Sequence, residues 1–184
     1  PCILYVNGKC EGPYLLAEHL SRNSWADELG HNRFSFHSCN GPREKTSARY
    51  VALQKWAMET PAPLGMEAVA GQADIHNLAA YMLAVAYCGT VNGFQGAGVL
   101  DRTEKEPRWR WVAWDLDESF RYTSGFDGRR EWEQRSWGWT YKHLGDKGYD
   151  PSEVRITLFT RLMDESPEFR RFFQRFVTDA LNHG

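Results

Sequence analysis

The chain has 184 residues, of which 42% are hydrophobic, 14% aromatic and 25% charged, and its formal net charge at pH 7 is −2. This composition is typical of one folded domain with a sizeable core, and it excludes a disordered chain. The small net charge gives no argument for binding nucleic acid or a membrane surface. No apolar run approaches membrane-spanning length, and the sequence opens without a signal peptide. We therefore expect neither nucleic acid nor a membrane among its partners, and the oligomeric state is not indicated.

The chain begins with the pattern of a β-hairpin. The strand-like run Cys2–Val6 is followed by Asn7-Gly8, a pair typical of two-residue hairpin turns. Because Pro13 interrupts the residues that follow, we expect the second arm to begin after it, over residues 14–18.

The sequence does not predict a disulfide between the first two cysteines. A two-residue turn places Cys2 opposite Pro13 and Tyr5 opposite Cys10, so the two thiols are out of register. The chain contains no C-x-x-C motif, so a structural zinc site is not indicated either.

Residues 21–41 are polar and predict a loop that carries a short strand at 34–37. Residues 46–59 have helical spacing of apolar side chains. The best predicted helix covers residues 74–88: Asp74 can cap it, and its apolar character almost all round predicts a central, buried position.

A glycine-dense loop is predicted at residues 89–98. Either this loop binds phosphate through its backbone N–H groups, or its glycines serve only to form turns. Residues 99–101 and 108–114 then predict a second hairpin across a charged turn.

The last third of the chain combines irregular and helical sequence. Residues 121–148 show no clean period and are predicted to be irregular. An Asp-Pro start at residue 150, a Ser-Pro start at residue 166 and apolar stripes predict two closing helices, at residues 154–163 and 169–181.

Two carboxylates, Asp115 and Asp117, follow the strand predicted at residues 108–114. Side chains two apart in a strand share a face, so these like charges need a cation between them. Mg²⁺ or Mn²⁺, which bind oxygen ligands, suit such a pair. The alternative is a solvated turn whose acids merely end the strand.

Four segments, which occur along the chain in the same order as in the family, resemble the spore-coat protein H (CotH) kinase family. Residues 4–19 resemble its "vNGeyrGvYlLtE" segment, and residues 110–120 its "fvpWDlDlsFg" segment. Residues 74–81 are similar to its helix, and residues 158–170 to its closing helices.

The resemblance implies an α+β, protein-kinase-like fold over residues 1–184, mostly the C-terminal lobe with the last hairpin of the N-terminal lobe. It implies an enzyme that uses ATP and Mg²⁺ (or Mn²⁺) to transfer phosphoryl groups to serines of a serine-rich partner protein. The resemblance also suggests that the protein is located in the spore coat, or is on the cell surface or secreted.

Carried over by position, Asp115 matches the metal-binding Asp of the family, and Asp117 is a second ligand or supports the first. Glu18, at the expected hinge, either contacts nucleotide or forms an ion pair. Trp114 either walls the adenine or fills the core.

The chain departs from the family in its catalytic loop and upstream of it. Asn92 stands where the family commonly has an Asp, and an amide cannot act as a general base at neutral pH. The family's upstream phosphate-binding serine and glycine segment and its lysine are not found, so we expect a partial domain with slow or no transfer on its own. The alternative is an inactive kinase-like binding module. A hydrolase that uses Asp115 and Asp117 as paired acids ranks last, because the two lie too close together.

Overall fold

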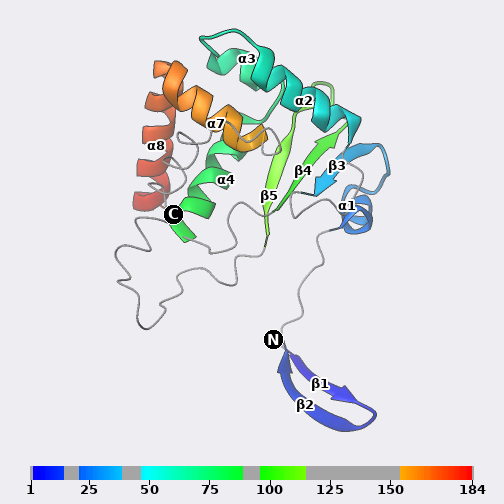
Figure 1. The fold of residues 1–184 in the computed structure, drawn as a ribbon. Helices are drawn as coiled ribbons and strands as arrows, with labels where there is room; N and C mark the ends of the chain where they lie inside the picture. The colour runs from blue at the N-terminus through cyan, green and yellow to red at the C-terminus, as the bar shows by residue number, and fades with distance from the viewer. Residues whose placement is uncertain (1, 15–20, 39–46, 89–95, 115–153, 184) are drawn as a thin grey trace. The chain divides into compact units, whose positions relative to one another are not determined.

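The computed structural model describes residues 2–14, 21–38, 47–88, 96–114 and 154–183. They belong to two compact units, residues 1–32 and 33–184, which are treated separately here (Figure 1). The described elements are helices and small antiparallel sheets, which confirms the α+β class. In these ranges, no helix combines the length and the apolar character that crossing a bilayer requires.

The first unit contains the predicted N-terminal hairpin. β1 (Cys2–Val6) and β2 (Lys9–Tyr14) pair antiparallel. Asn7 and Gly8 have φ angles of 51° and 81°, the left-handed conformation that a two-residue turn of this kind needs. The Asn-Gly pair therefore sets the turn as the sequence predicted.

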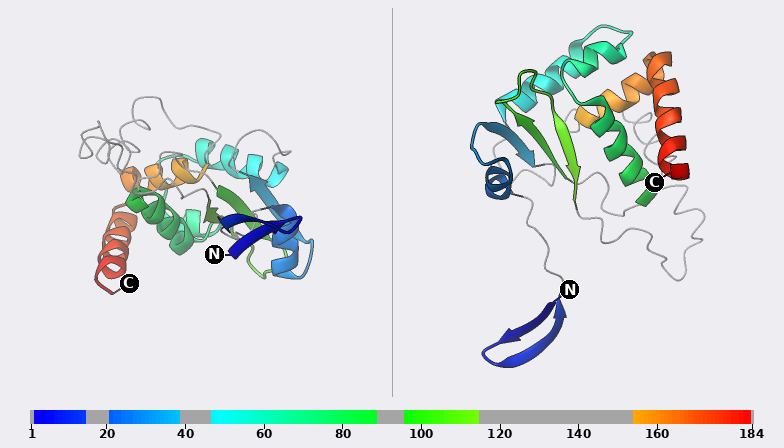
Figure 2. Two further views of the ribbon diagram at one scale, coloured as in Figure 1. Left: turned by 90° about the horizontal axis from the view of Figure 1, so that it is seen from below. Right: turned by 180° about the vertical axis from the view of Figure 1, so that it is seen from behind.

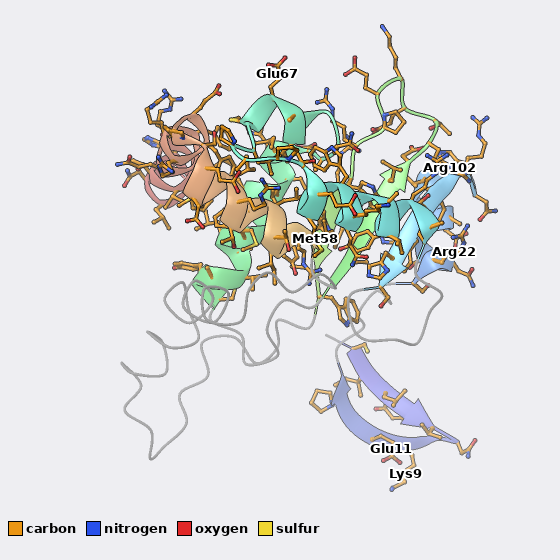
Figure 3. All side chains as sticks on the ribbon, turned by 45° about the horizontal axis from the view of Figure 1, so that its top comes forward. Lys9, Glu11, Arg22, Met58, Glu67 and Arg102 are labelled. Carbon is orange, nitrogen blue, oxygen red and sulfur yellow. The ribbon has the colours of Figure 1, made fainter. Side chains whose placement is uncertain are left out.

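The second arm includes Pro13, so the prediction that it starts after this proline is wrong. Pro13 lies in β2 opposite Ile3. A two-stranded ribbon leaves each strand one open edge, where a residue without an N–H group is tolerated. Lys9 and Glu11, two apart on β2, share a face and form a surface ion pair at 3.3 Å (Figure 3).

The register of the hairpin differs from the prediction at its open end. Cys10 has the predicted partner, whereas Cys2 lies opposite Tyr14 rather than Pro13. The register shifts by one residue after Leu4, as a β-bulge does. Both cysteines are exposed, and they are out of register with each other, as predicted.

A helix, α1 (Arg22–Leu29), occupies part of the segment predicted as loop. Ser21 and Ser24 cap it reciprocally: the Ser24 N–H donates to Ser21 Oγ at 3.2 Å, and the Ser21 N–H donates to Ser24 Oγ at 3.0 Å. Gly30 ends it in the left-handed conformation, with φ of 68°. None of its residues is buried, so there was no apolar stripe to detect.

The second unit is built on a three-stranded antiparallel sheet in the order β3-β4-β5 (Figure 1). These strands are β3 (Phe34–Ser38), β4 (Gly96–Asp101) and β5 (Arg110–Ala113). The predicted second hairpin is confirmed as β4–β5, and the short strand predicted at residues 34–37 is confirmed as β3.

β4 begins at Gly96, so the predicted start at Val99 is wrong, and the glycines there belong to the strand. Gly96 has φ of 151°, and a Cβ on it would collide with the carbonyl oxygen of Val112. A Cβ on Gly98 would lie 2.9 Å from Cε2 of Tyr50. Close approach of neighbouring groups explains both glycines.

The described residues of the second unit also form helices: α2 (Ala48–Glu59), α3 (Met66–Ala70), α4 (Ile75–Cys88), α7 (Val154–Glu165) and α8 (Pro167–His183). α4 packs against β5, α3, α7 and α8. It lies between β5 and α8 in Figure 1 and in the right-hand view of Figure 2. The central, buried helix and the two closing helices are thus confirmed, while α3 was not predicted.

Phenylalanines fasten α8 to α7. Phe169 and Phe173 are buried, and each meets the ring of Phe159 edge to face, with centroids 5.6 and 5.0 Å apart. Ala180, which continues the helical spacing of these phenylalanines, is exposed. The stripe therefore ends before the last turns of the helix.

An ionic network ties the end of α7 to the end of α2. Arg161, 5% exposed, donates to both carboxylate oxygens of Glu165 at 2.7 and 2.8 Å, and to the carbonyls of Ala57 and Thr60 at 2.7 and 2.9 Å. The Leu64 N–H also donates to Glu165, at 2.5 Å. The Arg161 hydrogen bonds hold the pKa of Glu165 below its usual value, against a smaller opposing effect of burial.

The crowding at Gly96 gives a stability prediction. Gly96→Ala should lower the free energy of unfolding by roughly 2–4 kcal/mol, because both the backbone conformation and the Val112 carbonyl exclude a Cβ. Gly71→Ala is the matched control: Gly71 has ordinary helical dihedrals, and its Cβ would make only ordinary contacts. Urea unfolding of both variants measures the difference, and equal stabilities would contradict the close approach.

Candidate functional site

Of the residues predicted to act on ligands, Trp114 lies in the described part of the chain. It is half-buried directly after β5. Glu18, Asn92, Asp115 and Asp117 lie outside the described residues. Their roles, and the choice for Trp114 between walling adenine and filling core, stay predictions.

The described strands fix where the chain approaches the predicted site. Gly96, at the start of β4, pairs with Ala113, at the end of β5. The chain therefore enters β4 and leaves β5 at the same end of the sheet. In the sequence, Asn92 precedes this end by four residues and Asp115 follows it by two, and both lie outside the described residues.

The outer edge of β5 is hydrogen-bonded by α4 and the residues before it. The Asn77 amide forms two bonds with the backbone of Trp111: Nδ2 donates to the carbonyl at 3.0 Å, and Oδ1 accepts from the N–H at 2.6 Å. The Trp109 N–H donates to the Gln72 carbonyl, and the Asp74 N–H donates to the Trp109 carbonyl, both at 2.9 Å. This edge strand thus has partners for consecutive polar groups of its backbone.

Asp74 caps α4, as predicted, and also holds an arginine of β5. Its Oδ1 accepts from the Asn77 N–H at 3.0 Å, and its Oδ2 accepts from Arg110 Nε at 3.1 Å. Burial raises the pKa of Asp74, but these hydrogen bonds outweigh it and the net pKa is lowered. Arg110 also donates to Glu104 at 2.6 Å, and this bond is the largest of the effects that raise the Arg110 pKa.

Polar side chains are buried near the end of the sheet at which β4 begins and β5 ends. Arg155 in α7 is fully buried, and its Nε donates to the Tyr81 hydroxyl at 3.0 Å. Tyr81 Cε2 in turn lies 3.5 Å from the position of a Cβ on Gly96. His37 stacks on Tyr50, with ring centroids 3.9 Å apart.

The imidazole of His37 is held neutral at physiological pH. Burial and, as a smaller effect, the positive charge of Arg155 together lower its pKa to about 4. The end of the sheet therefore carries the charge of a buried guanidinium but no imidazolium at neutral pH.

Three of these residues were not singled out from the sequence: Asn77, Tyr81 and Arg155. The signal for Asn77 was a polar residue in the first turn of an otherwise apolar helix. Arg155 had no comparable signal, because arginines on a helix are usually exposed.

The described residues do not form a metal site on their own. Among them, no group of three histidine, cysteine, aspartate or glutamate side chains could hold a metal ion.

The arrangement defines an α+β domain in which a helix-braced edge strand leads directly into an acidic pair. A family model described as CotH kinase protein matches residues 66–183. The match covers well over half of the chain, so the chain belongs to the CotH kinase family, as the sequence segments predicted. It includes α3, α4, β4, β5, α7 and α8, whereas the resembling segment at residues 4–19 lies outside it. No curated protein and no solved structure matches the chain.

The lowered pKa of His37 predicts a specific pH dependence. An unfolded histidine has a pKa near 6.5, so between about pH 6.5 and 4 the unfolded chain binds the proton more readily than the folded one. The contribution of His37 to the free energy of unfolding should be fully present above pH 6.5 and be lost as the pH drops towards 4. The loss should be at most about 2 kcal/mol after allowing for the partial exposure of the ring.

Urea unfolding across this range should show a smaller pH slope in His37→Gln than in the wild type. NMR titration should give the imidazole a pKa of about 4. A pKa above 6 would contradict the burial of this ring beside Arg155.

Proposed function

We propose that this domain is an ATP- and Mg²⁺- or Mn²⁺-dependent protein kinase that transfers phosphoryl groups to serine hydroxyls of a serine-rich partner protein. The observation that carries the proposal is the family match, because residues 66–183 include the Trp114–Asp117 segment. The bracing of β5 supports it, since a strand that presents a metal-binding carboxylate must be held in place.

In this proposal, Asp115 would hold the metal ion, and Asp117 would be a second ligand or would support the first. The donor set suits the ion, because Mg²⁺ prefers carboxylate oxygens. When bound, the ion would supply charge neutralisation at the phosphates. Trp114 would pack against the adenine, and Glu18 would contact the nucleotide near the hinge.

A second candidate function is a kinase-like module that binds partners without transferring phosphate. The observation that favours it is Asn92, which replaces the carboxylate expected of a general base. Both functions use the same fold, so nucleotide binding and phosphoryl transfer must be measured separately.

The first test measures metal binding. Asp115→Asn should weaken Mn²⁺ binding by about tenfold or more, because a first ligand is lost, with little change in melting temperature. Glu106→Gln is the matched control: it removes one carboxylate charge at an exposed ion pair with Arg108. Calorimetric titration with Mn²⁺ compares the three proteins.

Equal Mn²⁺ affinity of wild type and Asp115→Asn would contradict the metal site. A large fall in melting temperature of Asp115→Asn without metal would instead identify Asp115 as a structural, hydrogen-bonded residue.

The second test measures transfer by the longest form of the protein that its gene encodes. Incubation with γ-labelled ATP and a serine-rich protein should label serine, and Asp115→Ala should abolish the labelling. Nucleotide binding without transfer would favour the binding module, and the absence of nucleotide binding by calorimetry would overturn the kinase proposal.

A further inference from the structure

We propose that Asn77 is a positioning residue for the metal site, which it supports by fixing the backbone of β5 four residues before Asp115. This inference rests on the proposed function and names a residue that contacts neither metal nor substrate.

The geometry of the Asn77 contact resembles the pairing of a neighbouring strand. One side-chain amide donates to the carbonyl of Trp111 and accepts from its N–H, at 3.0 and 2.6 Å. Both distances are those of well-formed hydrogen bonds. The two bonds satisfy the amide as donor and as acceptor, which no carboxylate or hydroxyl in its place could do with the same geometry.

β5 needs this support because it is short and lies at the edge of the sheet. It has four residues, and β4 covers only its inner edge. A slip by one residue would exchange the faces on which its side chains lie. The indole of Trp111, 2% exposed, resists such a slip on one side, and the Asn77 amide resists it on the other.

The position of Asn77 is itself rigidly defined. Its own N–H donates to the Asp74 cap at 3.0 Å, and Asp74 also accepts from Arg110 of β5 at 3.1 Å. Two side chains at the start of α4 are therefore bonded to β5: Asp74 to the guanidinium of Arg110, and Asn77 to the backbone of Trp111. A displaced Asn77 would move the strand backbone directly, whereas loss of the Arg110 contact would remove only a side-chain bond.

The test compares Mn²⁺ affinity in Asn77→Asp with that in a variant destabilised elsewhere. Asn77→Asp keeps the shape and the acceptor for the Trp111 N–H, but loses the donor to the Trp111 carbonyl and sets a carboxylate oxygen against it. Supporting partners of metal ligands typically change affinity 10- to 100-fold, so we expect a loss of about tenfold. The added negative charge would by itself favour cation binding, so a loss cannot come from long-range electrostatics.

Glu165→Gln is the matched control for a purely structural effect. It breaks the ion pair within α7 between Glu165 and Arg161, the arginine that also donates to the Ala57 carbonyl near the end of α2. Titrations are made well below the melting temperature of each variant, with near-ultraviolet circular dichroism to verify packing. If Asn77→Asp does not fold, Asn77→Ser, which is too short for both bonds, takes its place.

The inference is supported if Asn77→Asp loses Mn²⁺ affinity while Glu165→Gln keeps that of the wild type, even at equal loss of melting temperature. It is overturned if the two variants bind Mn²⁺ alike while Asp115→Asn binds it weakly, and the proposed function then stands. If Asp115→Asn binds Mn²⁺ as the wild type does, the proposed function and this inference both fail.

Discussion

The hydrogen bonds between the first turn of α4 and the outer edge of β5 join the two layers of the larger unit. α4 also packs against α3, α7 and α8, so it contacts both the sheet and the other helices. The Asn77 amide and the backbone of residues 72–74 give β5 the partners that a further strand would otherwise supply. The sheet can therefore stop at three strands without leaving an open edge at these residues.

The sequence predicted the elements whose pattern is local. Asn7-Gly8 specified its turn through two positive φ angles, and the apolar stripes of α4, α7 and α8 specified their helices. It failed where a neighbour in space decides the conformation. Gly96 and Gly98 were predicted to lie in a loop, yet they belong to β4. They are glycines because Val112 and Tyr50 leave no room for a side chain.

The candidate site could be predicted only as far as its chemistry lies in adjacent residues. The acidic pair after Trp114 could be predicted because side chains two apart in a strand share a face, although Asp115 and Asp117 themselves lie outside the described residues. The contact of Asn77 with Trp111 joins residues 34 apart, and that of Arg155 with Tyr81 joins residues 74 apart. No periodicity relates such pairs, so these contacts become apparent only in the fold.

The ionic network at the end of α7 has a consequence for how the protein forms during synthesis. Arg161 donates to the carbonyl of Ala57, which lies 104 positions earlier in the chain, and Leu64 reaches Glu165 across 101 positions. Contacts of such separation close slowly, because the intervening chain must first lose its freedom. The end of α2 cannot acquire these partners until α7 has left the ribosome, so a nascent chain must wait for its last helices before the core can close. A chain truncated before α7 would keep the apolar faces of α2 and α4 exposed, and would be a substrate for chaperones and proteases rather than a smaller version of the domain.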